Sequence, residues 1–172
     1  ESWVDTATFA SLRHTQQIRE GGYHRNTSYE IFPERSTYSK NGGDEHPSVN
    51  LPLDDGAFIY YVRTLALDAG ERREVGRYFK PAQNPVVLVA SRRDSVDVPA
   101  GRFAAVVVQP AIPAVGMFAE GGRAELWMSR DARQLMVRMV THVSFGTLEL
   151  RLRSIQEGPQ VVAVRSGAIS GR

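Results

Sequence analysis

The chain has 172 residues, no cysteine and a formal net charge of +2 at pH 7. A chain of this length buries roughly 70% of its unfolded surface and forms a core without covalent staples, and the lack of cysteine excludes a disulfide scaffold, a thiolate metal site and a cysteine nucleophile. All of the 21 basic residues except Lys40 and Lys80 are scattered arginines, usually with an acidic residue nearby, which favours a mixed-charge surface over a nucleic-acid-binding patch.

The N-terminal part of the chain predicts strands. Trp3–Phe9 is rich in branched and aromatic residues, and Leu12–Arg19 and Tyr23–Phe32 flank a Gly-Gly turn that predicts a hairpin. A short segment at Ser36–Ser39 follows. The polar stretch Asn41–Asn50 predicts an exposed loop.

One helix is predicted over Asp55–Leu67, where either Asp54 or Asp55 supplies the N-cap and Gly70 follows the C-terminal end. Its apolar face consists of residues at three- and four-residue spacing: Phe58, Tyr61, Val62 and Leu65. No apolar run approaches the roughly 20 residues that a bilayer-spanning helix needs, so the chain is expected to have no transmembrane span of its own.

Strands return after this helix, and the segments that predict them are Glu71–Phe79, Pro85–Arg92, Asp94–Val98 and Phe103–Gln109. Residues 125–152 then predict a three-stranded meander that turns at Ser129–Arg133 and near Ser144–Gly146. The residues that we expect to form structural turns are Pro99, Gly101, Ser129, Asp131 and Gly146. A last short strand is expected at Val161–Arg165.

This pattern predicts a mainly β fold, in which a curled antiparallel sheet (a half-barrel or open sandwich) packs on one α-helix. Residues 1–155 are expected to form a single β-rich domain, and residues 156–172 a C-terminal strand and tail. The space between helix and sheet is a candidate apolar cleft, for which the lining residues are Phe58, Tyr61, Val62, Leu65, Phe103, Trp127 and Met139.

No segment of the sequence carries a strong catalytic or metal-binding motif. His14 and His142 occupy polar positions of strand patterns, and His46 lies in the predicted loop, so no converging metal-ligand set is expected. His24 beside Glu30 across a sheet remains an unconstrained alternative. No catalytic residue, metal site or cofactor is predicted, and the chain is not expected to be an enzyme.

Two further groups have plainer structural interpretations. Ser129 and Asp131 are better explained as a side chain closing its own turn than as part of a hydrolase elbow. The adjacent carboxylates of Asp54 and Asp55 stand where a helix needs its cap rather than as an acid–base pair.

Several segments carry a resemblance to a known family: 51–58, 77–81, Val-Pro-Ala-Gly-Arg-Phe at 98–103, Trp-Met-Ser-Arg-Asp-Ala-Arg at 127–133, and 145–148. Over about Trp3 to Ile155 the chain resembles the bacterial family catalogued as domain of unknown function 3108. The resemblance implies an exported, extracytoplasmic β-rich domain similar in shape to the half-barrels of lipoprotein carriers. It also implies that Glu1 falls inside the family's domain, after its first strands, and it assigns no catalytic residues.

Two functions follow as expectations. The first is a non-catalytic, periplasmic or otherwise extracytoplasmic extrinsic subunit that packs on a membrane-protein assembly, by analogy a photosynthetic reaction centre with its light-harvesting ring. Its partner interface is expected in the C-terminal tail, at Val161, Val162, Val164, Arg165 and Arg172. The alternative is a carrier or binding protein for a lipid or another apolar ligand, with an open cleft between helix and sheet.

Overall fold

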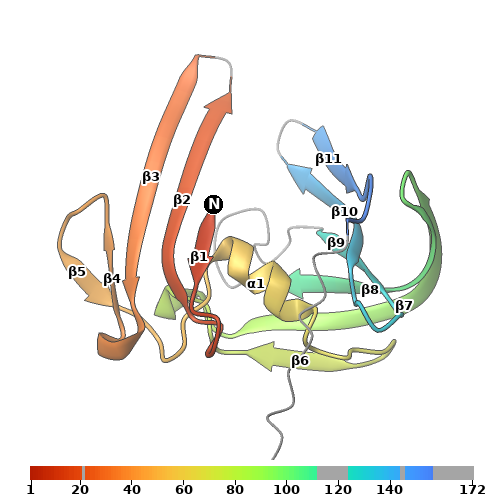
Figure 1. Ribbon diagram of the computed structural model, residues 1–172, viewed down its shortest axis with the longest axis horizontal. Coiled ribbons are helices and arrows are strands. Elements are labelled where there is room, and N and C mark those ends of the chain that lie inside the picture. Colours follow the sequence, from red (N-terminus) through yellow and green to blue (C-terminus); the bar gives the residue numbers. More distant parts are fainter. Residues whose placement is uncertain (21, 112–123, 144–145, 157–172) are drawn as a thin grey trace, which may run out of the picture.

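Two antiparallel sheets and one α-helix make up the part of the chain that the computed structural model describes, namely residues 1–20, 22–111, 124–143 and 146–156 (Figure 1). The mainly β class is therefore confirmed. The expectation of one curled sheet is wrong in one respect, because the strands divide between two sheets, neither of which closes. The strand and tail expected at residues 156–172 lie almost wholly outside the described residues.

The first sheet has five strands in sequence order: β1 (Ser2–Val4), β2 (Ser11–Glu20), β3 (Tyr23–Phe32), β4 (Thr37–Lys40) and β5 (Glu45–Pro47). The predicted hairpin is its long β2–β3 pair, in which His14 lies opposite Tyr29 and Gln16 opposite Thr27. The strand expected at Trp3–Phe9 is shorter because Asp5 accepts hydrogen bonds from the amides of Ala7 and Thr8 and turns the chain. Part of the predicted 41–50 loop pairs as β5.

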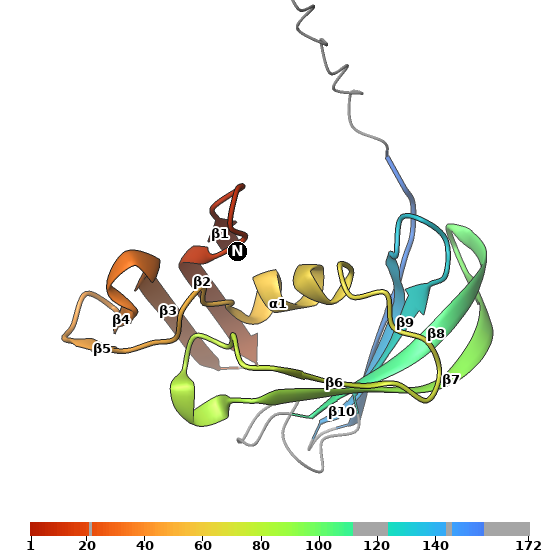
Figure 2. The ribbon, with the colours of Figure 1, turned by 90° about the horizontal axis from the view of Figure 1, so that it is seen from below.

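The second sheet has six strands: β6 (Arg72–Val75), β7 (Val86–Val98), β8 (Gly101–Ala111), β9 (Glu125–Ser129), β10 (Met136–Val143) and β11 (Gly146–Arg151). They also follow one another in sequence order, so the predicted three-stranded meander is present as β9–β11. The sheet bends, with β6 and β7 passing beneath the helix and β9–β11 rising beside it (Figure 2).

The helix α1 (Asp55–Val62) lies between the two sheets (Figures 1 and 2). It begins at Asp54, whose side chain accepts hydrogen bonds from the amides of Gly56 and Ala57 at the first turn. It ends five residues before the expected Leu67, where the backbone tightens: the amides of Thr64 and Leu65 donate to the carbonyls three residues earlier. The Arg63 side chain there donates to the backbone carbonyls of Arg133 and Gln134. Leu65 and Leu67 still pack against the core, but from a loop rather than from a helix.

The apolar interior consists of two clusters on opposite faces of the second sheet. The helix-side cluster contains buried residues from both sheets and from α1, among them Ile31, Phe58, Val62, Val106 and Met128. The far-side cluster has as its buried members Val96, Val98, Ala105, Val107, Trp127 and Val137. Strict alternation along β8 and β9 produces this division, since neighbouring side chains of a strand point to opposite faces.

An irregularity in β7 allows this strand to serve both clusters. Ala90 lies opposite Val108 but Arg92 lies opposite Val107, so Ser91 has no residue opposite it. The extra residue is a β-bulge, which bends the strand and shifts its alternation by one position. Pairing with β8 continues on both sides of the bulge, so the two strands expected at 85–92 and 94–98 form a single strand of 13 residues.

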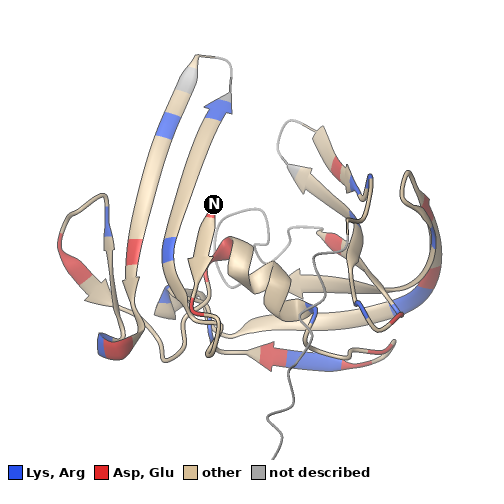
Figure 3. Cartoon of the chain, viewed as in Figure 1, with Lys and Arg blue, Asp and Glu red and all other residues tan. Residues whose placement is uncertain are grey.

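Charged residues are spread over both sheets rather than gathered on one of them (Figure 3). Many arginines form an ion pair with a nearby acidic residue, such as Arg92 with Glu125 at 2.7 Å and Arg138 with Glu149 at 2.7 Å. Within the described residues, no helix combines the length and apolar character needed to cross a membrane.

Candidate functional site

A dense group of polar side chains surrounds His14, where β1, β2, the start of α1 and the segment after β6 meet. We call it the His14 cluster, and its members are Ser2, Ser11, His14, Gln16, Asp54, Asp55 and Tyr78. The side chains of His14 and Asp54 are 6% and 0% exposed. Buried polar groups of this kind must be paired with one another, because an unpaired group costs the full loss of its hydration.

Asp54 is the centre of the hydrogen bonds. Its Oδ1 accepts from the hydroxyl of Ser2 at 2.5 Å and from the backbone amides of Gly56 and Ala57 at 2.8 and 3.2 Å. His14 Nδ1 lies 3.2 Å from the same oxygen. The helix cap and the buried ion pair therefore share one carboxylate oxygen.

Asp55 completes the cluster from the first turn of α1. It accepts hydrogen bonds from the Tyr78 hydroxyl at 2.5 Å and from the Gln16 amide at 2.7 Å. Its Oδ2 lies 3.6 Å from His14 Nε2, which is an ion-pair distance but too long for a hydrogen bond. His14 thus stands between two carboxylates, and Nε2 and Asp54 Oδ2 have no hydrogen-bond partner among the described residues.

These contacts decide the charge of the cluster. Burial lowers the pKa of His14, but the hydrogen bond with Asp54 and the charges of Asp54 and Asp55 outweigh it and raise the pKa to about 9. Burial likewise raises the pKa values of both carboxyls, and the hydrogen bonds from His14 and its neighbours bring them below the usual value. At neutral pH the cluster is one imidazolium between two carboxylates.

The geometry does not match a serine–histidine–aspartate triad. In a triad the serine and the carboxylate bond to opposite nitrogens of the imidazole. Here both Ser2 Oγ and Asp54 Oδ1 lie 3.2 Å from Nδ1, and the serine donates directly to the carboxylate. The arrangement ties the first sheet to the helix and prepares no nucleophile.

Sequence reasoning gave Asp54 or Asp55 as the cap, of which the structure shows Asp54, but it missed the role of His14. Forty residues separate the two, and nothing in the spacing links them. The available signal was the alternation of β2, which puts His14 and Gln16 on the same face as the half-buried Ile18. A histidine on the inward face of a strand needs a buried partner, and a pair of carboxylates at a helix start can provide one.

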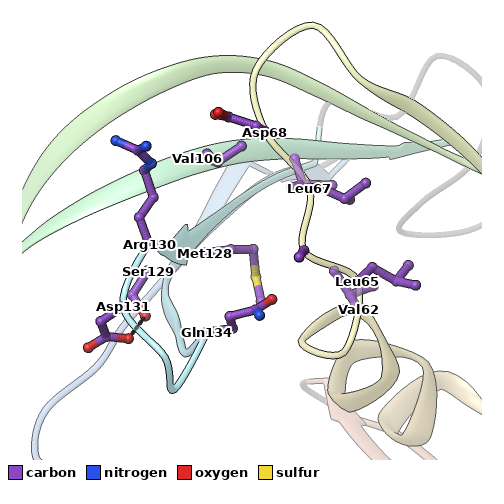
Figure 4. A pocket seen from close by; sticks show the side chains of 12 residues that line it. Val62, Leu65, Leu67, Asp68, Val106, Met128, Ser129, Arg130, Asp131 and Gln134 are labelled. Atoms are coloured by element: carbon purple, nitrogen blue, oxygen red, sulfur yellow. Dashed lines mark hydrogen bonds between the residues drawn. The ribbon is translucent and has the colours of Figure 1, made fainter.

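A pocket of about 210 Å³ lies at the other end of α1 (Figure 4). Its apolar walls come from the helix end, the loop that follows it and strands β8 and β9: Val62, Leu65, Leu67, Val106, Val108 and Met128. The Ser129–Asp131 turn forms its rim, and there Arg130 and Asp131 point in different directions (Figure 4).

The Ser129 and Asp131 side chains close the β9–β10 turn. The Ser129 hydroxyl donates to Asp131 at 2.7 Å and accepts from the Leu135 amide at 2.8 Å. Asp131 also accepts from the Arg133 backbone amide at 3.2 Å and pairs with the Arg133 guanidinium. The other expected turn residues lie at the β7–β8 turn, where Pro99 precedes Gly101, and at Gly146, the first residue of β11.

The structure divides the residues of the predicted cleft. Phe58, Val62 and Met139 belong to the helix-side cluster, with Tyr61 and Leu65 packed against it. The prediction is wrong for Phe103 and Trp127, which belong to the far-side cluster instead. The physical reason is alternation: Trp127 stands between two residues, Leu126 and Met128, that face the helix, so it must face away.

Trp127 is held on that far face by polar partners. Its indole nitrogen donates to Asp94 at 2.9 Å, and the guanidinium carbons of Arg138 and Arg92 lie 4.5 and 5.7 Å from the ring centroid. The residue is only 3% exposed. It is a structural anchor of the far side rather than a wall of a cleft.

The remaining histidines are separate from one another. His24 lies opposite Arg19, so the alternative of a cross-strand pair with Glu30 is wrong; Glu30 lies opposite Arg13. His46 packs beside Tyr38 with ring centroids 5.5 Å apart, and His142 bonds to Thr147 at 3.0 Å. In the described ranges, no three histidine, aspartate or glutamate side chains form a group that could hold a metal ion. The interface expected at Val161, Val162, Val164, Arg165 and Arg172 lies outside the described residues.

Comparison with known proteins gives a family and no named relative. No curated protein and no solved structure matches the chain. One family model matches residues 1–153, which confirms the family resemblance of the sequence. The chain belongs to the family described as "Protein of unknown function (DUF3108)".

Proposed function

We propose that the chain is a non-catalytic, extracytoplasmic extrinsic subunit that packs on and stabilises a larger membrane-protein assembly. The observation that carries the proposal is that apolar side chains fill most of the space between α1 and the second sheet. Phe58 and Val62 are 7% and 2% exposed and belong to the same apolar cluster as Val106 and Met128. In this proposal the helix packs on the sheets as a plug, so that the protein partner binds on the surface.

The size of the hollow beside α1, where the cleft is predicted, supports this choice over a lipid carrier. Two larger hollows, of about 530 and 420 Å³, are lined by residues outside α1. Sites for drug-sized ligands occupy roughly 300–1,000 Å³. The pocket at the end of α1 has about 210 Å³, which is too little for a whole lipid. A carrier would need the helix to move away and expose the cluster that Phe58 and Val62 now bury.

The polar groups support a non-catalytic role. The Ser129 hydroxyl donates to Asp131, and the Ser2 hydroxyl donates to Asp54 although His14 Nδ1 lies 3.2 Å away, so neither serine passes its proton to a histidine base. His14 is protonated at neutral pH and buried, and a protonated imidazole cannot act as a general base.

We place the docking surface on β11, the outermost described strand of the second sheet. All six of its residues are exposed, and Leu148 and Leu150 are 42% and 46% exposed. Exposed apolar residues on an edge strand favour pairing with a partner strand, through backbone hydrogen bonds and side-chain contacts. The C-terminal interface expected from the sequence follows this strand in the chain.

The proposal is tested by affinity purification of the tagged protein from native membranes; the first assembly to test is a photosynthetic reaction centre with its light-harvesting ring. A defined membrane-protein assembly should co-purify in fixed stoichiometry. The double variant Leu148→Ser/Leu150→Ser and a deletion of residues 158–172 should each reduce its recovery several-fold. Leu12→Ser is the matched control, because Leu12 is also an exposed leucine, 43% exposed, but lies on β2 of the other sheet.

Two outcomes would contradict the proposal. The first is undiminished recovery of the assembly with both altered proteins. The second is a stoichiometric phospholipid, or another lipid too large for the pocket at the end of α1, in an organic extract of the purified protein; its identification by mass spectrometry would favour the carrier instead. Circular dichroism of each variant establishes that the fold is retained, so a lost interaction is not mistaken for unfolding.

A further inference from the structure

The pocket at the end of α1 combines apolar walls with an unpaired positive charge at its rim. Val62, Leu65, Val106 and Met128 contribute to the walls, and Arg130 stands at the rim on the β9–β10 turn (Figure 4). Small-molecule sites in proteins commonly have this composition: a mostly apolar surface with a few polar groups that fix the orientation of the ligand.

The other charged residues at this rim are already neutralised. Arg93 makes two hydrogen bonds to the carboxylate of Asp68 and so lowers the pKa of Asp68 below its usual value. Arg133 pairs with Asp131 through two guanidinium hydrogen bonds, at 3.0 and 2.6 Å. Within the described residues, the Arg130 side chain makes no hydrogen bond or salt bridge, although Asp68 feels its charge at longer range. The Arg93–Asp68 and Arg133–Asp131 pairs cancel their own charges, so the net positive charge of this set of residues is that of Arg130.

The walls of the pocket are fixed to one another. Arg63 donates to the backbone carbonyls of Gln134 at 3.2 Å and Arg133 at 2.9 Å. With its amide oriented to satisfy its neighbours, Gln134 donates in return to the carbonyls of Arg63 and Leu65, at 2.7 and 3.3 Å. The backbone amide of Arg130 donates to Ala104 of β8 at 2.9 Å. A preformed pocket costs little ordering when a ligand binds.

We propose that this pocket binds a small amphiphilic monocarboxylate, with its chain among the apolar walls and its carboxylate on the Arg130 guanidinium. The volume limits the length of the chain. An apolar cavity of about 150 Å³ holds benzene, so a pocket of about 210 Å³ holds a chain of roughly six to eight carbons. A guanidinium binds a carboxylate through paired charge-assisted hydrogen bonds and repels an ammonium. This site goes beyond the proposed subunit function and does not depend on it.

Titration of the purified protein with a series of probes tests the site. By calorimetry, affinity should rise about threefold to fourfold per added methylene from butanoate to octanoate and then level off, as the burial of each methylene predicts. Octanoate should bind more tightly than 1-octanol, and octylamine most weakly. In NMR spectra the backbone amides of Leu65, Ser129 and Arg130 should shift together during the octanoate titration.

Two substitutions separate the head-group contact from the chain contact. Arg130→Gln should weaken octanoate binding about tenfold, as loss of a charge-assisted hydrogen bond predicts, and should leave 1-octanol binding within about twofold. Ala66→Phe, at an exposed position of the pocket lining, should weaken both ligands. Arg19→Gln, an exposed arginine on β2 of the other sheet, is the matched control and should change neither.

The inference is overturned if octanoate and octylamine bind equally, or if Arg130→Gln binds octanoate like the unaltered protein. It is also overturned if octanoate shifts no amide around the pocket. Thermal unfolding of Ala66→Phe shows whether that variant is folded. If Ala66→Phe is unfolded, the test rests on Arg130→Gln, whose position is exposed and therefore tolerates substitution. Loss of octanoate binding would leave the membrane co-purification unaffected, so the two proposals fail separately.

Discussion

The imidazole nitrogen Nδ1 of His14 lies 3.2 Å from Oδ1 of Asp54, in a contact where both side chains are almost completely buried. The pair joins a strand of the first sheet to the residue that caps α1. A charge that is buried with its partner is tolerated, whereas the same charge without a partner is strongly destabilising. This contact is therefore expected to determine the stability of the junction between the sheet and the helix.

Removal of the imidazole tests this expectation. His14→Ala leaves Asp54 buried without its cation and should lower the free energy of unfolding by about 3–5 kcal/mol. Urea denaturation measures the change. His24→Ala is the control, because His24 is exposed near the tip of the β2–β3 hairpin, and it should alter stability by about 0.5 kcal/mol or less. Equal stability of the two variants would show that the buried pair contributes nothing.

The His14 cluster also predicts a pH dependence of stability. The folded pKa of His14, about 9, lies above the usual 6.5. Its contribution is therefore complete below about pH 6.5 and is lost as the pH rises to about 9. The carboxyls of Asp54 and Asp55 have lowered pKa values, so their contribution is present above about pH 4 and is lost on acidification.

Denaturation at a series of pH values should thus show the highest contribution of this cluster between about pH 4 and 6.5. Between pH 6.5 and 9 the free energy of unfolding should fall by up to about 3 kcal/mol. In His14→Gln this alkaline decline should be much smaller, because glutamine does not titrate. A decline of the same size in His14→Gln would assign it to other groups.

The β9–β10 turn gives a third prediction. Ser129→Ala removes the hydroxyl that donates to Asp131 and accepts from the Leu135 amide, and should cost about 1–2 kcal/mol of unfolding free energy. Asp44→Ala, in an exposed loop of the first sheet, is the comparison and should have little effect. If Ser129→Ala is as stable as the unaltered protein, the turn is held by its backbone alone.

Trp127 and Asp94 give a fourth prediction. Trp127→Phe removes the indole donor, and Asp94→Asn removes the charge that accepts from it, so each should cost about 1.5–3 kcal/mol. The double variant should cost less than the sum, since both changes remove the same hydrogen bond. Strict additivity of the two costs would contradict the contact.

The same residue offers a spectroscopic check. The chain has two tryptophans, of which Trp3 is 44% exposed and Trp127 is 3% exposed. In Trp3→Phe, the remaining fluorescence should therefore be that of a buried indole, shifting to longer wavelength when the protein unfolds. A solvent-exposed spectrum for folded Trp3→Phe would contradict the far-side placement of Trp127.

Much of the fold could be predicted locally. The Gly-Gly turn located the β2–β3 hairpin, the Val-Pro-Ala-Gly turn located β7–β8, and the position of Asp54 before an apolar run located the start of α1. The end of α1 could not be predicted, because Leu65 continues the helical spacing. The loop there is stabilised instead by hydrogen bonds from Arg63 to a turn about 70 residues away.

The His14 cluster and the division of the core depend on contacts that the sequence does not display. Asp54 needed a partner from another sheet, and no spacing rule connects it to His14. Likewise Val137 and Met139 are two residues apart, a spacing that in a regular strand puts both side chains on one face. A register shift between Met136 and Arg138 puts them on opposite faces, in the far-side and helix-side clusters.

The unpaired Ser91 in β7 changes which residues of this strand face the helix. Val86, Leu88 and Ala90 face the helix, whereas Val96 and Val98, which have the same even spacing, face the opposite side. If Ser91 were instead paired in a regular ladder without a bulge, every residue beyond it would turn to the other face of the sheet. That register would expose two valines, bury Ser95 and Asp97, and carry Asp94 away from the indole of Trp127. Deletion of Ser91, by contrast, would let Arg92 follow Ala90 directly and would leave these residues on their present faces.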